Sequence, residues 1–138
     1  MKAIETTIFV TPTAKARVRI VTLRKGKNAG KVIAYTPRKT AKAEAEIRRH
    51  LVDLLVRFDA DVPLRLSLTF WLARPKSAPK DREYPVVKPD IDNLYKLLAD
   101  STQGIIPDDA QITNVSMCKR YCLPGQVPRI DIYLREEK

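Results

Sequence analysis

Histidine, cysteine and glycine are scarce in this chain, and each scarcity removes a class of function. The single histidine, His50, excludes an H-E-x-x-H metalloprotease site and has no evident serine or cysteine triad around it, so we interpret it as structural or surface-exposed. Two cysteines, Cys118 and Cys122, provide neither a disulfide framework nor a zinc site, and both are predicted to be free thiols. The four glycines form neither G-x-G-x-x-G nor G-x-x-x-x-G-K-S/T, which excludes the common nucleotide-binding motifs.

Long apolar runs are also missing, so no segment predicts a membrane span. The first ten residues lack the basic, apolar and small-residue pattern of a signal peptide, and an intracellular, cytoplasmic location is therefore expected. The 138 residues are 44% hydrophobic and show no internal repeat or domain boundary. We predict one domain over residues 1–138 that is large enough to bury a core.

Acidic residues are scarce in the N-terminal third, where the whole positive excess of the chain lies. Residues 1–49 hold 13 Lys or Arg against 3 Asp or Glu, whereas residues 50–138 hold 13 of each kind, and the net charge is +10. Such asymmetry is expected of a surface that contacts nucleic-acid phosphates and releases their counterions. A solvated surface without a partner would have a similar composition.

The N-terminal third predicts a set of short strands in which apolar and polar positions alternate. These strands are expected at residues 4–10, 16–23 and 32–35. The connection between the second and third strands is basic and contains two glycines, which allow tight turning. It is expected to contact the DNA backbone through Lys25, Lys27 and Lys31.

The middle of the chain predicts a helix, a strand and a long loop. Thr36-Pro37 suits a helix start, since a capping hydroxyl is followed by proline. The apolar face of this helix is assigned to Ile47, Leu51, Leu54, Leu55 and Phe58. Residues 64–72 alternate apolar and polar side chains, which predicts a strand with one buried face. Residues 73–88 are rich in proline and basic residues, and we expect a mobile loop that contacts DNA through Arg74, Lys76, Lys80 and Lys88.

Two further strands are predicted near the C-terminal end, at residues 111–121 and 127–134. The Leu123-Pro124-Gly125-Gln126 segment between them predicts an antiparallel hairpin. The resulting order of elements is strands, helix, strand, helix and two strands. This order predicts an α+β fold, a two-layer domain with both main helices packed on a mixed sheet.

The stretch from Lys88 to Gln111 gathers five aspartates within this basic protein. Pro89 and Asp90 suit the start of a helix, where an Asp90 side chain can cap free backbone N–H groups. Asp92 and Lys96 fall together on one face of that helix. The opposite, buried stripe is predicted to consist of Ile91, Leu94 and Leu98.

A second acidic pair, Asp108-Asp109, lies just before the strand predicted from residue 111. If the chain folds back there, Asp109 reaches the helix start beside Asp90 and Asp92. Carboxylates this close would raise one another's pKa unless a cation lay between them. Mg²⁺, or Mn²⁺ as a substitute, prefers such oxygen ligands, polarises a phosphoryl oxygen and lowers the pKa of a bound water. The pattern therefore predicts phosphodiester hydrolysis.

Each of these residues also has a purely structural interpretation. Asp90 alone is typical of a helix cap, Asp92 with Lys96 of an exposed ion pair, and Asp108-Asp109 of a turn. Their coincidence within one stretch favours catalysis. In that interpretation Lys96 offsets negative charge on the phosphate or orients the water.

The run Lys88-Pro89-Asp90-Ile91-Asp92-Asn93-Leu94-Tyr95-Lys96, followed by Asp100, Gly104 and Asp108-Asp109-Ala110-Gln111-Ile112, resembles the signature of RusA-type Holliday junction resolvases. The resemblance implies a homodimeric, Mg²⁺-dependent endonuclease that cuts four-way DNA junctions, with its acidic cluster near the dimer interface. It assigns Asp90, Asp92 and Asp109 to metal binding and catalysis, and Lys96 to the catalytic site. Asn93 and Asp108 match the signature as supporting residues.

The sequence therefore predicts a DNA endonuclease of recombination or repair whose partner is branched DNA, especially four-way junctions. A twofold homodimer would supply two related sites for two symmetric cuts. Two alternatives stay open at this point. One is a nuclease for flaps or forks, and the other is a non-catalytic nucleic-acid-binding protein.

Overall fold

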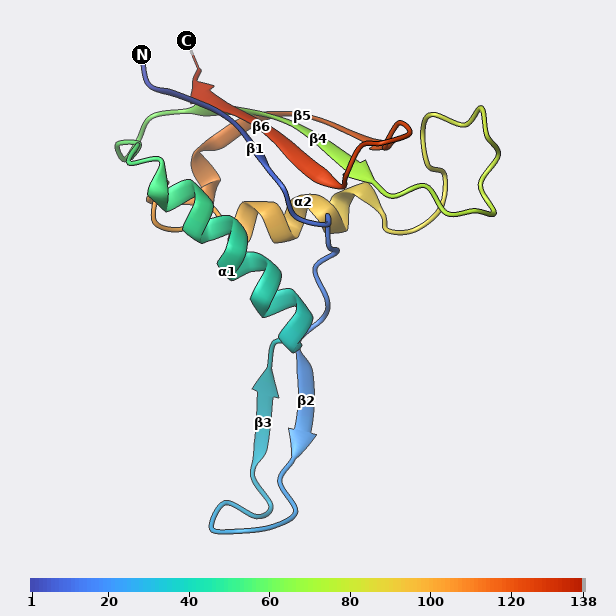
Figure 1. The fold of residues 1–138 in the computed structure, drawn as a ribbon. Coiled ribbons are helices and arrows are strands. Elements are labelled where there is room, and N and C mark those ends of the chain that lie inside the picture. Colours follow the sequence, from blue (N-terminus) through green and yellow to red (C-terminus); the bar gives the residue numbers. More distant parts are fainter. Residues whose placement is uncertain (138) are drawn as a thin grey trace.

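Two helices cover one face of a four-stranded sheet, and a separate two-stranded ribbon extends away from this body (Figure 1). The computed structural model describes residues 1–137. In chain order its elements are β1 (Ala3–Ile8), β2 (Arg19–Thr22), β3 (Val32–Tyr35), α1 (Arg38–Asp53), β4 (Leu64–Leu72), α2 (Ile91–Asp100), a short 3-10 helix (Asp109–Gln111), β5 (Ile112–Tyr121) and β6 (Arg129–Glu136). The predicted two-layer α+β fold with a mixed sheet is confirmed.

The sheet has the strand order β1-β6-β4-β5, with β5 parallel to β4 and the other neighbours antiparallel. The predicted hairpin between the last two strands is wrong, because β4 lies between β5 and β6. Residues 122–128 are enough to step across one intervening strand, since neighbouring strands are only about 4.8 Å apart. β4, the most apolar strand of this sheet, therefore has a neighbouring strand on each of its edges.

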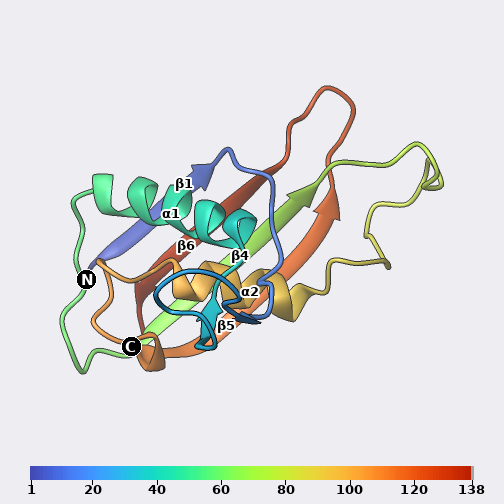
Figure 2. The ribbon, with the colours of Figure 1, turned by 90° about the horizontal axis from the view of Figure 1, so that it is seen from below.

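Strand β4 shows a regular alternation of buried and half-buried residues, and its predicted bounds are confirmed. Its inward side chains pack against Ile47 and Leu51 of α1 and Leu94 and Leu98 of α2 in one continuous core. Burying each such side chain fully contributes roughly 1.5–3 kcal/mol to stability. Figure 2 shows α1 and α2 lying side by side across this one face of the sheet.

Helix α1 begins at Arg38, with Pro37 at the N-cap position and no side-chain cap, so the predicted capping role of Thr36 is wrong. The apolar face is also shorter than predicted. The helix ends at Asp53, and Leu55 follows with a positive φ of 60° and an exposed fraction of 84%. Leu54 is exposed as well, whereas Phe58 turns back into the core and donates its N–H to the Ile105 carbonyl at 2.8 Å.

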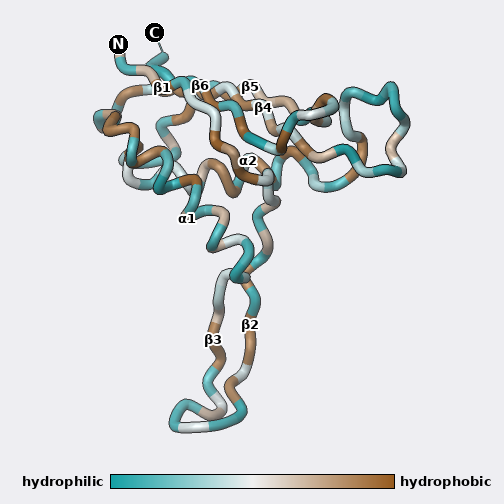
Figure 3. The backbone as a smooth tube through the Cα atoms, in the orientation of Figure 1, coloured by the Kyte–Doolittle hydropathy of each residue, from teal (hydrophilic) through white to brown (hydrophobic). Residues whose placement is uncertain are grey.

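The ribbon formed by β2 and β3 pairs only with itself among the described residues. All eight of its residues are exposed, including Ile20 at 71% and Val32 at 67%. Figure 3 shows the apolar residues along both strands of the ribbon and a hydrophilic turn at its end. The second strand, expected at residues 16–23, is therefore shorter at both ends and spans Arg19–Thr22. The basic connection between β2 and β3 lies at the far end of the ribbon, away from the core (Figure 1).

Three smaller predictions can be compared with the structure. His50 lies 3.0 Å from the Thr6 hydroxyl, which agrees with a structural role. Cys118 and Cys122 are free thiols as predicted, and burial raises the pKa of Cys122 above its ordinary value. Within residues 1–137, neither helix has the length and apolar character needed to cross a bilayer.

Candidate active site

The first turn of α2 presents its polar residues to solvent without using them to build the fold. Asp90 occupies the N-cap position with extended dihedral angles, and its carbonyl accepts the N–H groups of Asn93 and Leu94, each at 3.2 Å. Its carboxylate makes no capping hydrogen bond. Asp90 therefore starts the helix as predicted, but its exposed side chain is not committed to a cap.

Asp92 and Lys96 lie one helical turn apart on the exposed face of α2. Such a pair can form an i,i+4 ion pair. In the described part of the chain neither residue takes part in an ion pair or a side-chain hydrogen bond. The structural interpretation of the pair therefore has no support from the geometry, and both charges stay available to a ligand.

Lys119 of β5 holds the approach to α2 in place. Its Nζ donates to the carbonyls of Val87 at 2.7 Å and Pro89 at 2.9 Å, directly before Asp90. Lys119 is the register partner of Phe70 in β4, which is buried beneath the helices. The Lys119 side chain therefore lies on the same, helix-covered face of the sheet. Sequence reasoning missed this residue, although a lysine at an inward position of a strand was a usable signal.

The loop before α2 is fastened to the end of β5 rather than free along its length. Glu83 accepts the Tyr121 N–H at 2.9 Å and forms an ion pair with Arg120. The Arg120 guanidinium also lies over the rings of Trp71 and Tyr84, 5.1 and 5.3 Å from their centroids. These contacts fix the second half of the loop that the sequence predicted to be mobile.

The basic residues predicted to contact DNA fall into two groups. Arg74 shapes the loop, because it donates to the Pro79 carbonyl at 2.7 Å and lies 4.9 Å from the Tyr121 ring centroid. The other six are exposed and form no ion pair within residues 1–137. Three of them are in the loop and three at the end of the ribbon: Lys76, Lys80, Lys88, Lys25, Lys27 and Lys31.

Asp108 and Asp109 lie near the opposite end of α2 from Asp90. The Asp108 carboxylate caps the 3-10 helix by accepting the Ala110 N–H at 2.8 Å, and Gln111 completes a capping box. Asp108 and Asp109 line a cavity of about 160 Å³ together with Asp100 at the end of α2. Asp108 therefore has a structural role that the sequence did not resolve.

The expected fold-back of Asp109 onto the helix start does not occur within one chain. Because β5 runs parallel to β4, α2 must carry the chain back along the sheet before β5 can begin. A helix of ten residues spans about 15 Å, so its two ends are well separated. Among the described residues, no group of three or more His, Cys, Asp or Glu side chains is placed to hold a metal ion.

Residues 10–135 match the protein-family model described as Endodeoxyribonuclease RusA. This match covers most of the chain and includes both helices and the whole acidic stretch. The chain belongs to the RusA endodeoxyribonuclease family. No match is found among curated proteins. Family membership identifies the chain as a DNA endonuclease and favours nuclease activity over the non-catalytic alternative.

Tyr95, in the middle of α2 in this RusA-family chain, lies close enough to Asp109 to be affected by its charge. Burial raises the pKa of the Tyr95 hydroxyl above its ordinary value, and the negative charge of Asp109 raises it further. The phenol therefore stays neutral through the physiological range and can donate a hydrogen bond. Sequence reasoning treated Tyr95 only as part of the family signature.

The donor set at the start of α2 fits a hard divalent cation. Asp90 and Asp92 offer two exposed carboxylates whose oxygens have no protein partner within residues 1–137. Mg²⁺ is usually held by one or two carboxylates, waters and substrate phosphate oxygens, and does not need a closed protein cage. Two free carboxylates on a positioned helix turn are therefore sufficient for a site that a phosphate completes.

Proposed function

We propose that this RusA-family endonuclease resolves four-way DNA junctions as a Mg²⁺-dependent homodimer in recombination and repair. The observation that carries the proposal is the first two turns of α2, where Asp90, Asp92 and Lys96 are exposed and have no side-chain partner within residues 1–137. Because no fold contact occupies them, these charges are available to a metal ion and a phosphate, and they lie on consecutive turns of one helix. Mn²⁺ has similar ligand preferences and would substitute for Mg²⁺.

Asp90 and Asp92 would hold the ion, and the fixed backbone before them would keep the two carboxylates in place. When bound, the ion supplies Lewis acidity and a water of lowered pKa. Lys96, one turn further along the same exposed face, would offset negative charge on the phosphate during cleavage. The Asn93 carbonyl accepts the Lys15 N–H at 3.0 Å, and this hydrogen bond helps to hold the first turn of α2 in position.

Asp109 stays in the proposed ligand set, but its position requires a second copy of the chain. Within one chain it lines a cavity with Asp100 and Asp108, and no group of three carboxylates among the described residues is placed to hold a metal ion. A twofold dimer that placed the end of one α2 near the start of the other would bring Asp109 to the partner site. The same symmetry would supply the two related sites that paired cuts in a junction need.

The basic groups would hold the DNA around this site. Lys88 directly precedes α2, and Lys76 and Lys80 lie earlier in the same loop. The ribbon that carries the other three lysines extends away from the body (Figure 1). Phosphate contacts of this kind position a duplex without reading its sequence. They suit an enzyme that selects the shape of branched DNA.

The decisive experiment is cleavage of labelled four-way, forked, flapped and linear duplex DNA with Mg²⁺ or with EDTA. We expect symmetric paired cuts in the four-way junction with Mg²⁺, and binding without cleavage in EDTA. Preferred cutting of flaps or forks would replace the junction assignment by the other branched-DNA activity. Cleavage that persists in EDTA would contradict the proposed metal site.

A further inference from the structure

The outer edge of β5 has no partner strand within the described residues, although β5 is among the longest strands of the sheet. It lies at the end of the strand order, next to β4 only. Tyr121 N–H is bonded to the loop and Cys122 N–H to Leu72 of β4, so alternate residues direct their backbone groups to opposite edges. By this alternation Val115, Met117 and Lys119 direct their backbone N–H and C=O groups away from β4, toward the unpaired edge of β5.

This edge lacks the features that normally prevent strand pairing. Proteins protect free edges with charged side chains, proline, bulges or covering segments. Residues 114–118 contain no charged residue and no proline, and the one register irregularity lies before them, near Thr113. Val115 and Met117 are each 36% exposed, and within residues 1–137 the loop makes its one backbone hydrogen bond to β5 at Tyr121.

The two ends of β5 are complementary in charge. Asp109 precedes the strand and makes no ion pair or side-chain hydrogen bond within residues 1–137, and Lys119, whose ammonium binds only neutral carbonyls, lies near its end; Asp108 and Arg120 have partners in their own chain. When two identical strands pair antiparallel, the acidic end of each copy lies against the basic end of the other copy, so the same contact forms two times. Such a contact is closed by a twofold axis and is self-complementary.

We propose that β5 pairs antiparallel with β5 of a second copy, joining two four-stranded sheets into one eight-stranded sheet. The inference rests on the homodimer of the proposed function and names the surface that forms it. A twofold axis at Ser116 lies at the centre of the free edge and sets Val115 opposite Met117 of the second copy. It also directs Asp109 of one copy toward the start of the other copy's α2.

The β2–β3 ribbon is the rival surface, because it too exposes aliphatic side chains. Its strands and end carry several basic residues and no acidic ones, so two ribbons would repel each other. The ribbon therefore lacks the charge complementarity that β5 has. It provides a matched control for substitutions on β5.

The first test is sedimentation equilibrium of the full chain without Mg²⁺. We expect Val115→Lys with Met117→Lys to raise the dimer Kd roughly 100-fold or more, because like charges would face each other across the twofold axis. Ile20→Lys with Val32→Lys on the ribbon should leave the Kd unchanged. A dimer that tolerates the β5 changes, or dissociates on the ribbon changes, would overturn the inference.

The second test keeps the β5 surface nearly intact. At the proposed axis, Ser116 faces itself in a non-hydrogen-bonded pair, where Cα atoms lie about 4.5 Å apart and a disulfide can form. In a Cys118→Ser background, oxidised Ser116→Cys should form a covalent dimer. Ser67→Cys, in register on the adjacent inner strand β4, should not. Equal cross-linking of both variants, or none of Ser116→Cys, would contradict the pairing.

Junction cleavage, measured on the same wild-type samples, separates this inference from the proposed activity. A chain that cleaves junctions but sediments as a monomer overturns the β5 interface alone. A chain that dimerises through β5 but leaves junctions intact overturns the junction activity alone.

Discussion

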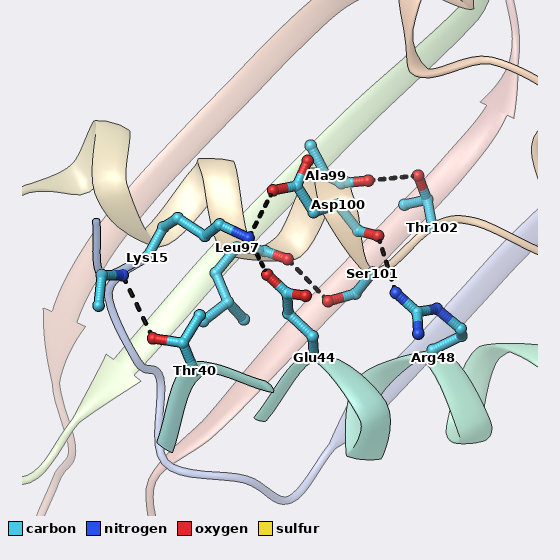
Figure 4. Close-up of polar contacts among 10 residues, drawn as sticks. Lys15, Thr40, Glu44, Arg48, Leu97, Ala99, Asp100, Ser101 and Thr102 are labelled. Atoms are coloured by element: carbon cyan, nitrogen blue, oxygen red, sulfur yellow. Dashed lines mark hydrogen bonds and ion pairs between the residues drawn. The ribbon is translucent and has the colours of Figure 1, made fainter. Parts of the chain in front are cut away.

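The two ends of α2 carry similar charges but use them differently. At the start, Asp90, Asp92 and Lys96 are exposed and unpaired within residues 1–137. At the end, Asp100 forms an ion pair with Lys15 at 3.0 Å, and Lys15 also pairs with Glu44 of α1 (Figure 4). The comparison separates charges that join elements of the fold from charges left available to a ligand.

The paired end fastens three segments of the chain to one another. Arg48 of α1 donates to the Asp100 carbonyl at 3.3 Å, and the Thr40 hydroxyl accepts the Ala16 N–H at 3.2 Å (Figure 4). Hydrogen bonding to Glu44 raises the pKa of Lys15 above its ordinary value; burial opposes this rise, and Asp100 adds to it. At the start of α2, by contrast, the described contacts are made to backbone carbonyls, by the Lys119 ammonium and the Lys15 N–H, and the side-chain charges take no part.

The largest expected effect comes from neutralising the unpaired end. Asp90→Asn or Asp92→Asn should lower Mg²⁺-dependent junction cleavage on the order of 100-fold or more, because a metal ligand is lost. The melting temperature without Mg²⁺ should stay equal or rise, since like-charge repulsion is relieved. Asp100→Asn is the matched control, expected to keep cleavage and to lose at most about 1 kcal/mol of stability. Full cleavage by Asp90→Asn or Asp92→Asn would remove that residue from the site.

Lys96→Ala should have the next largest effect. Loss of a charge that acts on the phosphate predicts a decrease in single-turnover cleavage of roughly tens-fold to a thousand-fold, with junction binding retained. Its stability should be unchanged, because Lys96 has no ion-pair partner among residues 1–137. A normal cleavage rate would show that Lys96 is only a solvated helix residue.

Lys119→Met tests whether the anchor before Asp90 matters to the unpaired end. Removing two charge-assisted hydrogen bonds to the Val87 and Pro89 carbonyls should cost about 1.5–3 kcal/mol of unfolding free energy. We also expect a higher Mg²⁺ requirement for cleavage, partly rescued in Lys119→Arg. A purely structural role would lower the melting temperature and leave the Mg²⁺ dependence unchanged.

The smallest effect is expected at the paired end and depends on pH. Because the folded-state pKa of Lys15 is raised, its contribution to stability is present below the ordinary lysine pKa of 10.5 and is lost as pH rises through the higher folded value. The melting-temperature difference between wild type and Lys15→Met should therefore be constant from pH 7 to 9 and shrink in more alkaline solution. Cleavage at neutral pH should not change. A difference that grew with pH would contradict this ion-pair network.

Local patterns predicted the elements whose signal lies within one stretch of chain. Strand β4 alternates apolar and polar residues over its whole length, and α2 has its N-cap and buried stripe in nine residues, so both follow from periodicity alone. The predicted cap of α1 was wrong because the helix begins one residue later than the Thr36-Pro37 pattern indicates, with Pro37 and not Thr36 at the N-cap position. Periodicity could not choose between them.

Pairing between distant strands could not be predicted in this way. Short connections favour hairpins, and no local property of residues 112–121 shows that they run parallel to β4. This error also led to a wrong expected position for Asp109. A parallel β5 requires α2 to run back along the sheet first, which places Asp109 near the end of α2 and not near its start. Lys119 was missed for the same reason, because its partners, the Val87 and Pro89 carbonyls, belong to a loop about 30 residues earlier in the chain.

The strand order has a consequence for synthesis on the ribosome. β6, which follows β1 and β4 in the chain, lies between them, so neither of these can complete its pairing before β6 emerges. Translation at about 5–20 residues per second leaves β1 waiting for several seconds while α1, β4, α2 and β5 appear. The edges of β1 and β4 that pair with β6 lack that partner during this time, so closure of this sheet has to wait for β6.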